Sequence, residues 1–178
     1  MKILLATLSA ALMLAGCVNT SKANRPLVAL KKAPEFTLKN ALGGELKSAD
    51  FQGKVLVVDF WATWCVPCKK EIPEYHELRR KYKDQGLEFL GVTFDSSEKE
   101  LKAFLEDIKI EYPLAWGTEA VDVAFGGHTG LPTTFLIGKD WKIYRKMFGN
   151  DGTKMKALEK DIIALLEKPA EVPAQPAY

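Results

Sequence analysis

The sequence is poor in the residues that build metal sites and disulfide frameworks. It has three cysteines and two histidines among 178 residues. A zinc site needs four protein ligands, or three and a water. Three cysteines also cannot form a set of structural disulfides in which every thiol is paired. A scaffold held together by several disulfides is therefore excluded, and few candidate ligands are left for a metal.

The chain also lacks an excess of either charge. It has 25 Lys and Arg against 23 Asp and Glu, a formal net charge of +2, and no basic cluster stands out. Nucleic-acid binding depends on a basic surface that neutralises phosphates, so we expect no nucleic-acid partner. There is no internal repeat, and the length suits one domain with a substantial core.

The one long apolar run lies at the N-terminus. It follows Lys2 and extends from Ile3 to Ala15. A positive start, an apolar stretch and small residues before a cleavage site are typical of a secretory signal. The run is also shorter than the about 20 residues that span a bilayer. We therefore expect export across a membrane, with the domain on the periplasmic or extracytoplasmic face of the cell envelope.

The end of this run, Leu14-Ala15-Gly16-Cys17, resembles the bacterial lipobox. The resemblance implies that residues 1–17 are a lipoprotein signal peptide and that Cys17 is acylated and becomes the mature N-terminus. Several acyl chains make a stable membrane anchor plausible, which one chain does not. A plain signal peptide cut elsewhere and an uncut anchor are the alternatives. If Cys17 is lipidated, Cys65 and Cys68 can pair only with each other.

Composition divides the rest of the chain into three parts. Residues 18–33 are polar, with several lysines and one proline, and we expect them to form a tether. Residues 169–178 are rich in proline and alanine, which predicts a disordered tail. We expect residues 34–168 to fold as one domain.

The most informative motif of that domain is Trp64-Cys65-Val66-Pro67-Cys68. Two cysteines separated by two residues can close a disulfide across one helical turn and open it again. The apolar run 55–60 before them predicts a buried strand, and the spacing of apolar residues over 72–82 predicts a helix. Cys65 thus lies at a helix start, where free N–H groups and the helix dipole stabilise a thiolate. We expect Cys65 to attack, and Cys68 to be buried and to resolve the mixed disulfide.

The remaining patterns predict a mixed α/β domain. A βαβ crossover followed by a β-hairpin and a helix gives a mixed sheet with helices on both faces. The expected elements are a hairpin at 36–46, a strand at 55–60, a helix at 66–84 containing Pro73, a strand at 87–93, a helix opened by Ser97, an edge strand at 112–114, a helix at 119–125, a hairpin of strands 133–137 and 142–148, and a last helix capped by Asp151 or Thr153.

Three segments resemble the membrane-tethered thioredoxins of the TlpA/ResA type, which have a redoxin or AhpC/TSA-like domain. They are Asp59-Phe60-Trp61-Ala62, the run from Trp61 to Pro73 around the cysteine pair, and Leu131-Pro132-Thr133-Thr134. The resemblance covers about residues 33–168. It implies the thioredoxin fold, with a mixed central sheet flanked by helices, an N-terminal β-hairpin and a central insertion near 95–118.

The resemblance also implies roles for residues outside the cysteine pair. Leu131-Pro132 is implied to be a cis-peptide bond opposite the cysteines, which leaves the backbone beside it free to bind an extended substrate chain. Trp64 is implied to be a lid or docking surface. Asp59 is implied to be a buried acid, with a pKa raised by desolvation, that takes the proton of Cys68.

Glu71 is a second candidate acid. It follows Cys68 by three residues, on the same helical face. The family pattern has Glu here, where its charge would raise a thiol pKa and help to move protons. A solvated position on the helix face beside Lys69 and Lys70 is the alternative. The same family often has Asn at the position of Asp59, so this chain departs toward thioredoxin there.

Together these features predict an extracytoplasmic, lipid-anchored thiol–disulfide oxidoreductase, monomeric and without cofactor or metal. By resemblance it reduces protein disulfides, with apocytochrome c among the candidate substrates, and draws electrons from a membrane thiol transporter. Val66 and Pro67 have no side-chain donor for a thiolate, which suggests a reducing character.

The alternatives are a dithiol oxidase, or a copper chaperone using Cys65, Cys68 and His128. Copper chaperones of this fold usually have three residues between their cysteines, whereas this chain has two. A peroxidase is less favoured, because peroxiredoxins have Thr three residues before the reactive Cys, where this chain has Ala62.

Overall fold

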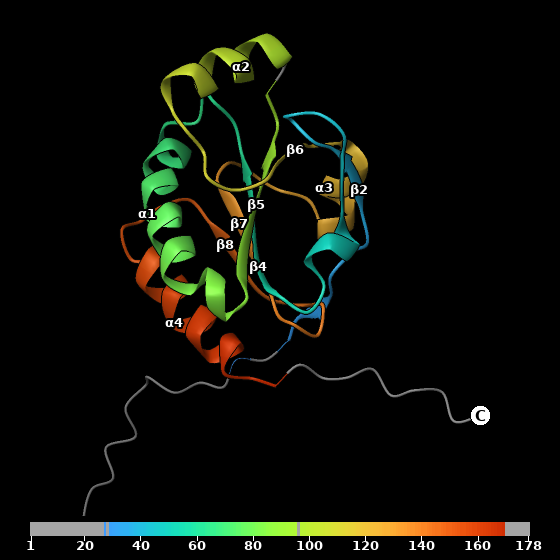
Figure 1. The fold of residues 1–178 in the computed structure, drawn as a ribbon, viewed down its shortest axis with the longest axis vertical. Coiled ribbons are helices and arrows are strands. Elements are labelled where there is room, and N and C mark those ends of the chain that lie inside the picture. The colour runs from blue at the N-terminus through green and yellow to red at the C-terminus, as the bar shows by residue number, and fades with distance from the viewer. Residues whose placement is uncertain (1–26, 28, 96, 170–178) are drawn as a thin grey trace, which may run out of the picture.

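A six-stranded mixed sheet forms the centre of the computed structural model, which describes residues 27, 29–95 and 97–169 (Figure 1). The strand order is β1-β8-β7-β4-β5-β6. β4, β5 and β6 are parallel, while β7 is antiparallel to β4 and β8 to β7. The strands are β1 Lys31–Lys32, β2 Thr37–Lys39, β3 Glu45–Lys47, β4 Val55–Trp61, β5 Leu87–Thr93, β6 Leu114–Trp116, β7 Thr133–Ile137 and β8 Lys142–Phe148.

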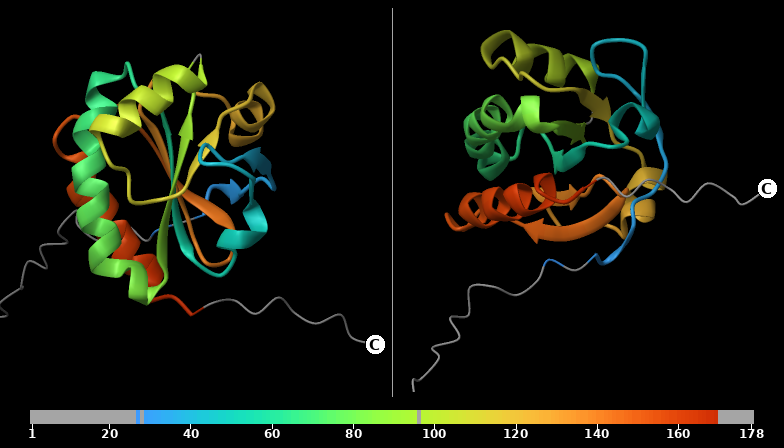
Figure 2. Two further views of the ribbon diagram at one scale, coloured as in Figure 1. Left: turned by 45° about the horizontal axis from the view of Figure 1, so that its top comes forward. Right: turned by 60° about the horizontal axis from the view of Figure 1, so that its bottom comes forward.

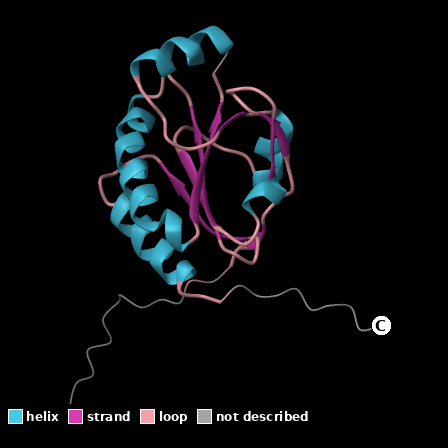
Figure 3. Cartoon of the chain, in the orientation of Figure 1, coloured by secondary structure: helices cyan, strands magenta, loops and turns pink. Residues whose placement is uncertain are grey.

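Helices cover both faces of this sheet (Figures 1 and 3). The helices are α1 Val66–Tyr82, α2 Glu98–Asp107, α3 Glu119–Phe125 and α4 Lys154–Leu166, with 3-10 turns at Ser48–Phe51 and Lys83–Gln85. α1 and α4 lie side by side on one face, and α3 lies on the other with the β2–β3 hairpin (Figure 2). The predicted thioredoxin fold, with its N-terminal hairpin, is confirmed.

The pleat of β4 divides the core into two halves. All seven residues of this strand are buried. Val55, Val57 and Trp61 pack with residues of α1 and α4, whereas the alternate residues pack with those of α3 and the hairpin. Side chains alternate between the two faces of a strand, so Asp59, between Val57 and Trp61, faces α1 and α4.

The predicted edge strand is displaced. We expected it at 112–114, but β6 covers Leu114–Trp116. Pro113 has no N–H to give to a strand ladder, and its carbonyl instead accepts the N–H of Gly91 at 2.9 Å. The hairpin joins this edge, because the N–H of Ala41 donates to the carbonyl of Leu114 at 2.8 Å.

The last residues of the segment expected to be a tether form part of the sheet. Lys31 and Lys32 form β1 and pair with β8, and Ala33 is buried. A very short edge strand made of lysines protects the sheet from pairing with another chain. The folded part of the chain therefore includes residues 31–33.

The expected signal peptide, with Cys17, and most of the expected tail lie outside the described residues. Within the described part, no helix is long and apolar enough to cross a bilayer.

Candidate active site around Cys65 and Cys68

Cys65 and Cys68 are joined by a disulfide at the N-terminus of α1. Cys65 is the N-cap residue, and its Sγ accepts the backbone N–H of Cys68 at 3.3 Å. Pro67 fits the first turn because its missing N–H has no partner there in any helix. Both cysteines are buried, with 4% of Cys65 and 1% of Cys68 exposed. Cys65 is thus only slightly more accessible than Cys68 in the disulfide form.

Asp95, which the sequence analysis did not single out, fixes the loop before the cysteines. Its carboxylate accepts the backbone N–H of Thr63 at 2.9 Å and the hydroxyl of Thr63 at 2.6 Å. It also accepts the hydroxyl of Thr93 at the end of β5. The turn that leads from β4 into Cys65 is therefore tied to the neighbouring strand.

Exposed apolar side chains flank Cys65 of the buried disulfide on both sides in the sequence. Trp64 is 63% exposed and Val66 is 59% exposed. The Leu131–Pro132 peptide bond is cis. It directly precedes β7, whose first residue, Thr133, pairs with Phe60 near the end of β4 from which the cysteine loop departs.

Phe148, which the sequence analysis missed, is a further exposed apolar side chain near the cis-peptide bond. It is 51% exposed and ends β8 opposite Thr133. The next residue, Gly149, donates its N–H to the carbonyl of Pro132 at 2.9 Å. Such an apolar surface suits an extended polypeptide better than a small polar substrate.

Asp59 is a buried acid with two hydroxyl partners. It pairs in register with Thr134 of β7, whose hydroxyl contacts Asp59 Oδ1 at 2.7 Å. The Tyr75 hydroxyl contacts the same oxygen at 3.3 Å. Burial raises the pKa of Asp59 to about 7, and the nearby Lys154 charge opposes this shift. The carboxyl can therefore change its protonation near neutral pH.

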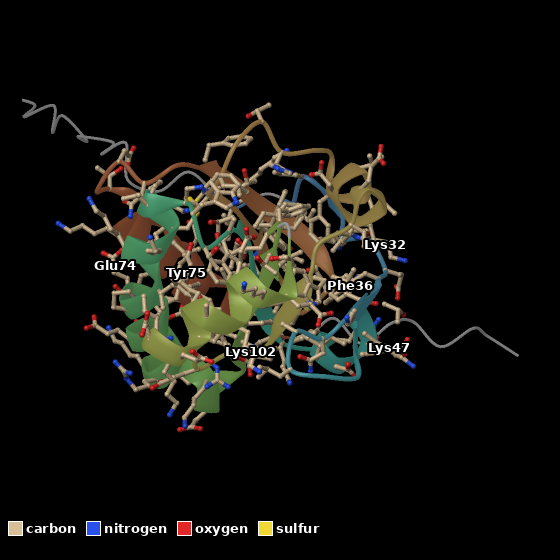
Figure 4. The ribbon with its side chains drawn as sticks, turned by 90° about the horizontal axis from the view of Figure 1, so that it is seen from above. Lys32, Phe36, Lys47, Glu74, Tyr75 and Lys102 are labelled. Atoms are coloured by element: carbon tan, nitrogen blue, oxygen red, sulfur yellow. A yellow bond between two sulfur atoms is a disulfide. The ribbon has the colours of Figure 1, made fainter. Side chains whose placement is uncertain are left out.

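Glu71 is fully buried, so the solvated position considered for it is wrong. Its Oε1 lies 2.7 Å from Lys154 Nζ, and its Oε2 lies 2.9 Å from the Tyr75 hydroxyl. Burial raises the pKa of Glu71, while the charge of Lys154 lowers it. Figure 4 shows Tyr75 directed into the molecule and Glu74, its neighbour on α1, at the periphery.

Three residues of this polar cluster, namely Lys154, Tyr75 and Thr134, were not predicted to be functional. A signal was present in the sequence for Lys154. It precedes Leu158, Ile162 and Leu165 at helical spacing, on the face that α4 buries. A lysine in an otherwise apolar stripe indicates a buried charge, which needs a partner of opposite charge.

His128 contacts an acid and two aromatic rings. Its Nδ1 lies 2.7 Å from Asp122 Oδ1, and its ring packs against Phe94 and Phe60. The described residues contain no group of three metal-ligating side chains. No contact in this part of the chain therefore favours the copper-chaperone alternative.

Comparison with known proteins agrees with this geometry. The sequence profile of the AhpC/TSA family matches residues 29–146. The thiol-disulfide oxidoreductase ResA of Bacillus thuringiensis is 35% identical over 67% of this chain and 69% of its own length. ResA of Bacillus subtilis is 31% identical over 78% of this chain and 75% of its own length.

Solved structures show the same relationship. A protein of Chlorobium tepidum described as a thiol:disulfide interchange protein DsbE superposes with a TM-score of 0.72 at 32% identity, over 79% of this chain and 99% of that one. A thioredoxin from Neisseria meningitidis reaches a TM-score of 0.65 at 28% identity, over 75% of this chain and 91% of that one. With its Cys65–Cys68 pair at a helix N-terminus, the chain belongs to the AhpC/TSA family and, within it, to the ResA/TlpA-like thiol–disulfide oxidoreductases.

Proposed function

We propose that this oxidoreductase is a lipid-anchored reductant of protein disulfides on the extracytoplasmic side of a membrane. The observation that carries the proposal is the cysteine pair at the helix start, where exposed Trp64 and Val66 flank Cys65 and the same half of the core contains buried acids. The substrate class is an exported protein with an accessible disulfide, apocytochrome c included. A membrane thiol transporter is the proposed electron donor, and the protein works as a monomer.

The proposed reaction has two exchange steps. The Cys65 thiolate attacks a substrate disulfide, forms a mixed disulfide and releases one substrate thiolate. Cys68 then loses its proton and attacks Cys65 Sγ, which releases the second substrate thiolate and closes the Cys65–Cys68 disulfide. The substrate gains two electrons and the dithiol loses two. Asp59 is the proposed acceptor of the Cys68 proton.

The direction of transfer is tested by the reduction potential of the Cys65–Cys68 pair. We expect a value below about −200 mV, on the side of thioredoxin and away from the about −120 mV of a strong oxidant. The reason is that no side chain of Val66 or Pro67 donates to a thiolate, and the buried carboxyls disfavour a second negative charge beside them. Equilibration with glutathione buffers, read out by thiol alkylation, measures the potential. A value near −120 mV would support the dithiol oxidase instead.

The lipid anchor is tested by replacing Cys17. A Cys17→Ser chain cannot form the thioether, and we expect it to leave the membrane fraction. Fractionation of cells that express each form, followed by detection of the domain, makes the comparison. A matched Ser21→Ala change controls for altered export. A Cys17→Ser protein that is processed normally and stays bound as strongly as the parent would contradict lipidation.

Asp59→Asn is expected to change both resolution and the pH dependence of stability. First attack by Cys65 should persist, while resolution by Cys68 slows because the acceptor is lost. Burial raises the pKa of Asp59 from 3.8 to about 7. Between these values the folded state binds more protons than the unfolded state, so stability falls as pH rises. The fall is on the order of 4 kcal/mol.

The Asn variant should lack this component of the fall. Its amide resembles the protonated acid, so the variant is expected to match the parent below about pH 4 and to exceed its stability by an amount that grows as pH rises to about 7. The carboxyl is not uncompensated, because it has the hydroxyl contacts of Thr134 and Tyr75. Urea unfolding of the oxidised forms at several pH values measures the difference. Parallel stability curves for parent and variant would refute a raised pKa.

A further inference from the structure

A continuous chain of hydrogen bonds joins the two buried acids. Asp59 Oδ1 lies 2.7 Å from Thr134 Oγ1, which lies 3.1 Å from the Tyr75 hydroxyl. That hydroxyl lies 2.9 Å from Glu71 Oε2 and makes a longer contact, of 3.3 Å, with Asp59 Oδ1. Glu71 Oε1 then lies 2.7 Å from Lys154 Nζ. All five side chains are buried, and they come from four elements, β4, β7, α1 and α4.

The oxygen-to-oxygen contacts set the number of protons in this chain. Three consecutive contacts, each within hydrogen-bond distance, need three hydrogens. The two hydroxyls supply one hydrogen each, and an ionised carboxylate supplies none. If both acids were ionised, Thr134 would donate to Asp59 and Tyr75 to Glu71, and two lone pairs would meet at the 3.1 Å contact between the hydroxyls. A third proton on one of the carboxyls removes this conflict.

The balance of charge also indicates that the two carboxyls hold one proton between them. Two ionised carboxyls beside one ammonium group leave a net negative charge in a site closed to water, which is costly. One proton on either acid makes the cluster neutral, with Lys154 balancing the carboxylate that remains. Glu71 is in direct contact with Lys154 Nζ, whereas Asp59 accepts hydrogen bonds from Thr134 and Tyr75 and is affected by the Lys154 charge at longer range.

We propose that Asp59 and Glu71 share one proton, which passes between them through the two intervening hydroxyls. When the proton is on Asp59, each hydroxyl donates toward Glu71. When it is on Glu71, each hydroxyl donates toward Asp59. The transfer breaks one O–H bond at the carboxyl that gives up the proton, breaks and forms one at each hydroxyl, and forms one at the other carboxyl, so the number of protons is unchanged.

This proposal deepens the proposed function and rests on it for its role in catalysis. When the shared proton is on Glu71, the Asp59 carboxyl is ionised. It can then accept the proton of Cys68 without first losing a proton to solvent. Tyr75, Thr134, Glu71 and Lys154 are then positioning residues, because they act through Asp59. Asp59 keeps its acceptor role at a pH where an isolated buried carboxyl would already be protonated.

Other ionisable groups that face the two acids are few. From α1 these are Tyr75 and the exposed Glu74, and from α4 it is Lys154. Tyr112, in the segment before β6, also senses both carboxylates, which raise its pKa together with burial. The two cysteines of the active site complete the set in the reduced form. The pH test below therefore uses the disulfide form first, in which the thiols do not titrate.

The shared proton is tested by carbon NMR of the Asp and Glu carboxyl groups in the oxidised full chain, followed over pH. We expect the Asp59 and Glu71 signals to move together, with the same midpoints, as for one coupled pair. In Tyr75→Phe the chain is cut, and the two titrations should separate. Thr134→Val leaves only the longer contact of 3.3 Å between the Tyr75 hydroxyl and Asp59 Oδ1, so the two midpoints should move apart by less. Tyr112→Phe is the matched control. It removes the hydroxyl of another buried tyrosine, whose ring packs against that of Tyr75. The two midpoints should stay equal in this variant.

Reaction rates give a second readout. At pH 6 we expect resolution of the mixed disulfide to be about tenfold slower in Tyr75→Phe than in the parent, and nearly equal at pH 8.5. In Thr134→Val the slowing at pH 6 should be smaller. A purely structural role would slow the reaction equally at both pH values. Independent titration of Asp59 with a static Glu71 signal in the parent would overturn the proposal. It would do so even if the enzyme traps its substrates normally, so failure here is distinct from failure of the proposed function.

Discussion

A Cys68→Ser variant is expected to accumulate a mixed disulfide with its substrate, whereas Cys65→Ser should accumulate none. Cys65 is the N-cap residue, and its sulfur accepts the N–H of Cys68, a contact that favours a thiolate. Cys68 is the more deeply buried thiol and belongs to the core cluster that α1 forms with the sheet. Without Cys68 the first exchange still occurs, but nothing displaces the substrate from Cys65.

Both variants should lose steady-state disulfide reduction down to the uncatalysed background, because each lacks half of the dithiol. The discriminating measurement is therefore covalent capture, followed by non-reducing electrophoresis of cell extracts and release by reductant. The double variant Cys65→Ser with Cys68→Ser controls for noncovalent association. Capture through Cys68 in the Cys65→Ser variant would reverse the two roles.

Local sequence patterns predicted most of the helices and strands. The expected boundaries of β5, α3, β7 and β8 agree with the structure, because each element has a clear periodicity and a turn beside it. Ser97 caps α2 by accepting the N–H of Glu100, as the spacing indicated. The last helix shows the limit of such patterns. Thr153 occupies its N-cap position, but its side chain does not cap the helix and donates to Asp151 instead, while Asp151 accepts the N–H groups of Thr153 and Lys154.

Elements stabilised by distant partners were harder to predict. β1 contains only Lys31 and Lys32, which have low β-propensity, and it exists because β8 offers a free edge. The polar cluster behind the disulfide has the same origin. Asp59 and Glu71 were identified as candidates near the cysteines, but their connection depends on Thr134 and Lys154, which lie 75 and 83 residues away from them in sequence.

The burial of Glu71 could have been inferred from spacing. Tyr75, Leu78 and Tyr82 follow it at intervals of four, three and four residues, so it belongs to the buried stripe of α1. Its pairing with a lysine from the C-terminal helix could not, since periodicity reports which face is buried but not which element covers it. Tertiary packing supplied that information.

Replacing Lys154 by methionine is expected to lower the free energy of unfolding by about 3–5 kcal/mol at pH 8, the usual cost of removing one partner of a buried ion pair. Methionine keeps the length and apolar stem of the side chain but leaves Glu71, which is fully buried, without its counter-charge. Because the charge of Lys154 lowers the pKa of Glu71, the variant should raise that pKa further. A folded-state pKa above the unfolded value means that stability falls as pH rises.

The loss should therefore be smaller at pH 5, where Glu71 can take up a proton and become neutral, and larger at pH 8. Lys156→Met is the matched control, since Lys156 is an exposed residue of the same helix, and it should change stability by less than about 0.5 kcal/mol. Urea unfolding of the oxidised proteins at both pH values gives the comparison. The double variant Lys154→Met with Glu71→Gln should recover part of the stability lost at pH 8, because it removes the unpaired charge. A loss that is equal at pH 5 and pH 8, without recovery in the double variant, would show that Lys154 contributes packing and not charge.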